Sequence, residues 1–90
     1  MSCRIERLAT SGESVVLRVS GRINGEDVGT LQEVIGQEHG GVTLDLTEII
    51  LVDYDAVKLL ALSEANGIEL RNCPSYIREW VARERNRTGL

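Results

Sequence analysis

Ninety residues, of which 42% are hydrophobic, suffice for one domain with one buried core. The chain has one Trp, two Tyr and no Phe, so this core must consist of Leu, Ile and Val. A formal net charge of −4 argues against a general nucleic-acid-binding protein, which is normally basic. We therefore expect a single domain over residues 1–90, with its core at about 4–85.

The ends and the cysteines of the chain carry little functional signal. Residues 71–90 hold five Arg and two Glu, a pattern typical of a solvated helix face. Cys3 and Cys73 have no metal-ligand spacing around them, and the first residues lack the apolar segment of a signal peptide. No window approaches the ~20 apolar residues of a membrane span. We expect a cytoplasmic protein with free thiols and no membrane insertion.

The first half of the chain predicts a hairpin and a helix. Apolar and polar residues alternate weakly over Arg4–Leu8 and clearly over Ser14–Ser20, which predicts two strands. Thr10–Glu13 between them has the composition of a turn. Asn24 is the predicted N-cap of the helix that follows. The helix is expected to end at Gly40 and Gly41. Its apolar residues recur at helical spacing: Val28, Leu31, Val34 and Ile35. His39 is expected to be structural.

The second half predicts two crossover units. Val42–Leu46 is short and apolar enough for a central strand, and a loop then leads to Asp53, the predicted N-cap of the next helix. Asn66-Gly67 ends that helix, and Ile68–Arg71 predicts the last strand. Pro74 suits the first position of a final amphipathic helix. The order is β-β-α-β-α-β-α, which predicts an α/β fold with a mixed four-stranded sheet packed with helices.

Three motifs in this order carry a resemblance to a known family. They are Gly21–Asn24 (Gly-Arg-Ile-Asn), Val42–Thr47 running on to Asp53–Ala56 (Asp-Tyr-Asp-Ala), and Gly67–Leu70 before the segment that follows Pro74. They resemble the STAS domain, the fold of bacterial anti-sigma factor antagonists, over roughly residues 5–85. The resemblance implies a STAS-like fold and a regulatory protein that acts by binding another protein.

Position 55 departs from the family pattern. In the family's Asp-Ser-Ser-Gly, a partner anti-sigma kinase phosphorylates the second Ser; Asp55 stands in its place here, flanked by Tyr54 and Ala56. Asp cannot accept a serine-type phosphate ester, and it carries one charge where phosphoserine carries about −1.5 to −2. Asp55 therefore either imitates the phosphorylated state or marks a lost switch with a retained binding surface. It also suits the first turn of a helix, with Lys58 as an ion-pair partner.

The helix after Asp53 directs one stripe of side chains away from the sheet. Tyr54 on this stripe suits the centre of an interface, although it can also fold back over Ile50 and Val52, or be phosphorylated itself. The residues expected to bind a partner are Asp53, Tyr54, Asp55, Ala56, Lys58 and Leu62.

Three acidic residues offer an alternative from another class of function. Asp45, Asp53 and Asp55 are predicted near one strand end, and three carboxylates can hold Mg²⁺ or Ca²⁺. No phosphate-binding loop accompanies them, and no base is expected near a Ser or Cys nucleophile. We expect no enzymatic activity, no cofactor and no metal, with weak nucleotide binding as the alternative.

The leading hypothesis is a regulatory module that docks to a protein partner through residues 47–62. The resemblance implies an anti-sigma factor kinase, or another signalling protein, as that partner. A STAS subunit of an ABC-type lipid transport complex, seated on an ATPase subunit, is the second hypothesis. A homodimer formed through the last helix, with Tyr76 and Trp80 partly exposed, is a structural alternative.

Overall fold

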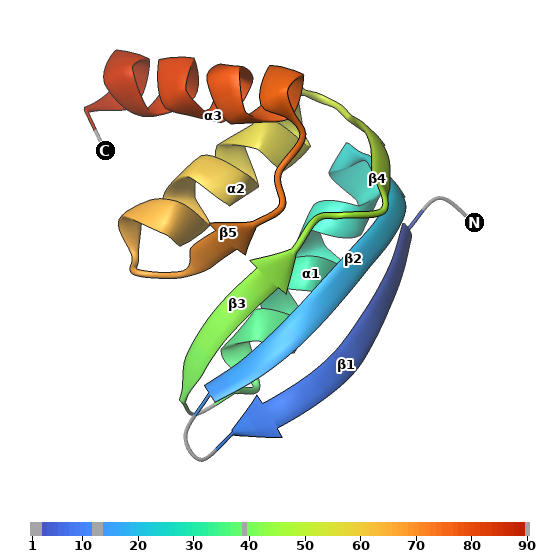
Figure 1. The fold of residues 1–90 in the computed structure, drawn as a ribbon. Coiled ribbons are helices and arrows are strands. Elements are labelled where there is room, and N and C mark those ends of the chain that lie inside the picture. The colour runs from blue at the N-terminus through green and yellow to red at the C-terminus, as the bar shows by residue number, and fades with distance from the viewer. Residues whose placement is uncertain (1–2, 12–13, 39, 90) are drawn as a thin grey trace.

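The computed structural model of the chain describes residues 3–11, 14–38 and 40–89, which form one mixed sheet and three helices (Figure 1). The predicted turn at Thr10–Glu13 lies partly, and His39 wholly, outside these residues. In chain order the elements are β1 (Cys3–Ser11), β2 (Ser14–Ile23), α1 (Gly25–Gly36), β3 (Gly41–Asp45), β4 (Ile49–Val52), α2 (Tyr54–Ala65), β5 (Glu69–Arg71) and α3 (Ser75–Thr88).

The sheet has the order β1-β2-β3-β5, with β4 paired to the end of β2. The predicted hairpin is confirmed, because β1 and β2 pair antiparallel. The predicted crossovers are confirmed as well, because β2 pairs parallel to β3 and β3 pairs parallel to β5. The α/β fold with a mixed sheet therefore agrees with the prediction.

The described residues form five strands, and the prediction of four was wrong at β4. Ile49–Val52 was expected in a loop, but it pairs parallel to Gly21–Ile23. Because β1 occupies the other edge of β2 as far as Gly21, β4 lies on the same edge as β3. The ten-residue β2 is long enough to pair with β3 along Ser14–Arg18 and with β4 at its end. Pairing with the end of β2 makes this short apolar run a strand.

The helices cover one face of the sheet and enclose the core. Along β2, Val15, Leu17 and Val19 are buried, and they alternate with residues that are partly exposed. Helix α1 passes behind β2 and β3 in Figure 1, and α2 packs against α1, α3 and β5. α1 ends at Gly36, earlier than predicted, soon after its last apolar residues. Over the described part of the chain, no helix combines the length and apolar character needed to cross a membrane.

Candidate functional site

The candidate site lies at the start of α2, and Asp53 fixes its geometry. One carboxylate oxygen of Asp53 accepts a hydrogen bond from the Ala56 N–H at 2.9 Å, which confirms the predicted N-cap. The other oxygen accepts from the Gly25 N–H at 2.7 Å, and the Asp53 N–H donates to the Ile23 carbonyl at 3.2 Å. A single side chain therefore ties the first turn of α1 to the first turn of α2.

Asp55 is exposed in the first turn of α2 and faces the start of α1. A Cβ atom at Gly25 would lie 2.8 Å from Oδ2 of Asp55, so the carboxylate rests directly against that glycine. The sequence also suggested Lys58 as an ion-pair partner of Asp55. Among the described residues no ion pair joins the two. The carboxylate instead lies where the dipoles of two helix starts favour an anion.

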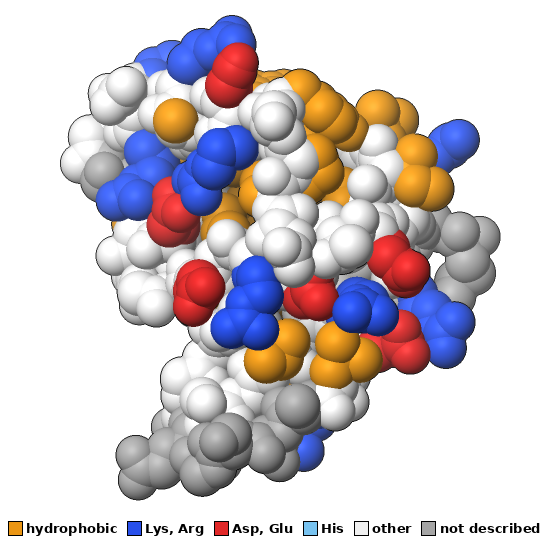
Figure 2. Space-filling view, viewed as in Figure 1, with side chains coloured by type: hydrophobic (Ala, Val, Ile, Leu, Met, Phe, Trp, Pro, Cys, Tyr) orange, Lys and Arg blue, Asp and Glu red, His pale blue; other side chains and the backbone are white. Residues whose placement is uncertain are grey.

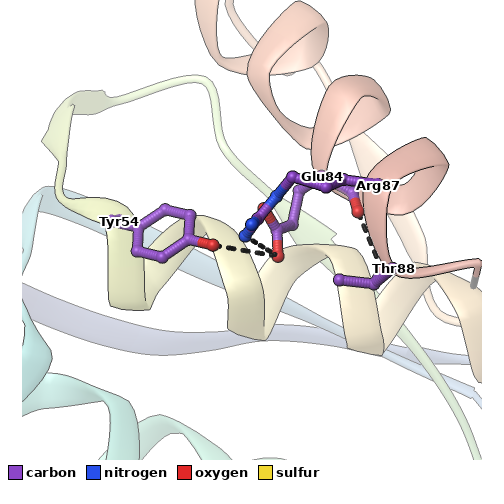
Figure 3. A network of polar contacts seen from close by, with 4 residues as sticks. All are labelled: Tyr54, Glu84, Arg87 and Thr88. Atoms are coloured by element: carbon purple, nitrogen blue, oxygen red, sulfur yellow. Dashed lines mark hydrogen bonds and ion pairs between the residues drawn. The ribbon is translucent and has the colours of Figure 1, made fainter.

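Tyr54 points away from α1, toward the end of α3 (Figure 3). Its hydroxyl donates a hydrogen bond to Oε2 of Glu84 at 3.4 Å, and the side chain stays 42% exposed. The Lys58 ammonium and the Arg87 guanidinium each lie 5.4 Å from the centre of its ring, within the range of cation–π attraction. The two neighbouring residues Tyr54 and Asp55 thus face different helices.

Glu84 is a buried carboxylate on α3 that this arrangement stabilises. Only 4% of its side chain is exposed, and Arg87 donates to it through both Nε and Nη2, at 3.0 to 3.3 Å. Thr88 donates to the Glu84 carbonyl at 2.8 Å (Figure 3). A buried charge needs such partners, and charge-assisted bonds are the strong ones. The contact between Tyr54 and Glu84 joins residues 30 positions apart, and no local sequence pattern indicates it.

The other predicted partner-binding residues divide between surface and core. Lys58 is exposed, and Leu62 is 42% exposed on the same stripe of α2 as Tyr54. Ala56, by contrast, is fully buried. Its side chain packs in the core, and any contribution to docking comes from holding α2 in place.

Sequence reasoning missed an apolar surface beside the site. Ile50 is 67% exposed and Leu51 50%, and Tyr76 at the start of α3 donates a hydrogen bond to the Ile50 carbonyl at 2.7 Å. Figure 2 shows hydrophobic side chains gathered over β4 and the start of α3. The signal was the run Ile49–Val52, which we expected in a loop. It is a strand whose register against β2 shifts between Gly21 and Arg22, and both of its middle residues are exposed.

Asp45 has structural partners of its own. Its carboxylate accepts from the Thr47 N–H at 3.0 Å and the Thr47 hydroxyl at 2.5 Å, and it pairs with Nη2 of Arg18 at 3.2 Å. The bonds from Thr47, aided by those from Arg18 and Asn72, lower the pKa of Asp45 from 3.8 to about 2 against the opposing effect of burial.

The three aspartates considered for metal or nucleotide binding do not form one site. Asp45 is bound to Arg18 and Thr47, Asp53 caps α2, and Asp55 faces Gly25. Within residues 3–11, 14–38 and 40–89, no group of three His, Cys, Asp or Glu side chains is placed to hold a metal ion.

The fold has a counterpart among solved structures. It is similar to the crystal structure of an antisigma-factor antagonist, a STAS domain from Rhodobacter sphaeroides, with a TM-score of 0.52. The match covers 78% of this chain and 82% of that chain at 20% sequence identity, which shows a shared fold. No protein-family model and no curated protein matches the chain.

Proposed function

We propose that this chain is a non-enzymatic regulatory module that docks to a protein partner through residues 47–62. The observation that carries the proposal is the start of α2, where Tyr54 and Asp55 project from a junction held by Asp53. Such a junction in an α/β fold is a usual place for binding. Exposed Ile50 and Leu51 add apolar surface beside it. The shared fold with an antisigma-factor antagonist supports the same function.

The proposed docking surface carries a permanent charge at Asp55. An aspartate forms no serine-type phosphate ester, so Ser phosphorylation cannot switch this position. The contact of the carboxylate with Gly25 supports a fixed anion between two helix starts. Two roles remain for the charge: it imitates a phosphorylated serine, or it is one part of a surface whose shape matters more.

Partner capture with tagged protein from the native host tests the proposal. We expect wild type to retain a protein partner and Asp55→Lys to lower the affinity for it at least about tenfold, since about 1.4 kcal/mol is tenfold. Glu33→Lys is the matched control, because Glu33 is exposed on α1 and undergoes the same change of charge. No stable partner, or equal losses in the two variants, would contradict docking at this surface.

Two milder variants separate the two roles of Asp55. If the charge imitates a phosphate, Asp55→Asn and Asp55→Ser lose binding as Asp55→Lys does. If shape dominates, Asp55→Asn keeps most of the affinity. The identity of the captured protein also separates the hypotheses: an anti-sigma factor kinase favours the signalling role, and an ATPase subunit of a transporter favours the transport role.

A further inference from the structure

Two cations beside Tyr54 retain donors for a further ligand. Lys58 is exposed, and none of the ion pairs found among the described residues includes it. The Arg87 side chain is 65% exposed and binds Glu84 through Nε and Nη2 only, so the described hydrogen bonds leave its Nη1 group unused. By contrast, Arg78 and Arg85 both bind Glu64.

The charge on this side of α2 is positive. The carboxylate of Glu84 is buried and matched by Arg87, so the Lys58 charge has no counterpart there. The nearest acid along the chain, Asp55, lies against Gly25 at the start of α1. An incoming carboxylate would therefore meet two cationic donors, the Lys58 ammonium and the Arg87 guanidinium, over the ring of Tyr54.

Apolar surface adjoins these cations on the same side. Tyr54 and Leu62 are each 42% exposed, and they lie on either side of Lys58 at steps of four residues along α2. We call the four residues Tyr54, Lys58, Leu62 and Arg87 the Tyr54 surface. It combines a rigid aromatic anchor, an aliphatic side chain and two cations, and two of these residue types, Tyr and Arg, are enriched at interface centres.

We propose that the Tyr54 surface binds a partner segment that presents carboxylates beside an apolar side chain, as on one face of an acidic amphipathic helix. This inference rests on the proposed function and specifies the chemistry of the partner. Carboxylates at i and i+4 reach Lys58 and Arg87, while an apolar residue between them covers Leu62 and the ring of Tyr54. Charge complementarity sets the orientation and association rate, and the apolar contact supplies most of the affinity.

Two synthetic helical peptides test this inference on the full chain. They share one spacing of Leu residues, and the charged positions are all Glu in one peptide and all Lys in the other. We expect the Glu peptide to shift the amide NMR signals of Tyr54, Lys58 and Leu62, with an affinity that falls as salt is raised from about 50 to 500 mM. Lys58→Glu should weaken the Glu peptide about tenfold and strengthen the Lys peptide, whereas Arg83→Glu, at an exposed position of α3, should change either by less than about twofold.

The results separate failure of this inference from failure of the docking region. If the Lys peptide shifts the same signals as strongly, the acidic partner is wrong and the docking region stands. If the Glu peptide shifts signals elsewhere, or neither peptide shifts any signal within residues 47–62 at millimolar concentration, the inference is overturned. The capture experiment with Asp55→Lys then decides separately about the docking region.

Discussion

At the scale of single residues, the carboxylate of Asp45 has structural partners on a neighbouring strand and in the loop that follows it. It stands in a row of charges of alternating sign across four strands, because the strand register places Glu6 opposite Arg18, Arg18 opposite Asp45, and Asp45 opposite Arg71. Figure 2 shows basic and acidic side chains alternating across the sheet face that the helices leave open. We therefore assign Asp45 to the stability of the sheet.

The lowered pKa of Asp45 makes stability depend on pH. The pKa of Asp45 is about 2 in the folded chain, below the ordinary 3.8. The ionised carboxylate therefore stabilises the fold fully at pH values above about 4, and this stabilisation is lost as pH falls to about 2. At 1.36 kcal/mol per pKa unit, this loss amounts to about 2 kcal/mol. Urea unfolding of wild type and Asp45→Asn between these pH values measures it. Asp45→Asn should lose about 2 kcal/mol less on acidification, and an equal loss in both proteins would contradict the assignment.

The sequence alone did not predict this role of Asp45. Along the chain Asp45 precedes Asp53 and Asp55 at the same junction, which suggested one acidic site. The register between β2 and β3 places Arg18 opposite Asp45. The N–H of Thr47, two residues further along the chain, donates a hydrogen bond to the Asp45 carboxylate. A partner 27 residues away depends on tertiary pairing, which local patterns do not contain.

At the scale of elements, α2 is the best predicted part of the chain and β4 the worst. Asp53 and Asn66 were predicted as the two ends of α2, and they are its N-cap and C-cap, because capping is decided by residues within one turn. The run Ile49–Val52 has neither alternation nor length, so it had no strand signal of its own. The surface of Ile50 and Leu51 was missed for the same reason.

Helices α2 and α3 are joined by ion pairs at Glu64. Arg78 donates to its two carboxylate oxygens at 2.6 and 2.8 Å, and Arg85 donates at 3.0 Å. The hydrogen bonds from Arg78 have the largest effect on the pKa of Glu64. Together with the bond from Arg85 they lower this pKa, against the opposing effect of burial. Spacing within α3 suggested a solvated basic face, whereas these two Arg side chains hold α3 against α2.

Glu64→Gln tests this joint between the helices. The substitution keeps the size of the side chain and removes its charge, so we expect the free energy of unfolding to fall by about 1–2 kcal/mol, allowing for partial exposure of the Arg side chains. Glu79→Gln, at an exposed position of α3, should change it by less than about 0.5 kcal/mol. Chemical denaturation at neutral pH measures both, and equal effects would show that the Glu64 bonds contribute nothing specific.

At the scale of the whole molecule, the charges paired across the sheet lie on its open face, away from the proposed docking surface. The open face carries the paired row that includes Arg18 and Asp45, while the start of α2 carries side chains without such pairs. Asp55 faces α1 and Tyr54 faces α3, so the junction presents a negative side and a positive side next to each other. The resemblance identified in the sequence indicated where this junction lies, and the packing of α3 against it was not foreseen.

Site-specific photo-crosslinking in the native host tests the docking claim most directly. A photoreactive amino acid replaces Leu51, Leu62 or the control residue Glu33, all of which are exposed. We expect covalent adducts with a protein partner from positions 51 and 62, and none from position 33 on α1. Adducts from position 33 with none from positions 51 and 62 would contradict it.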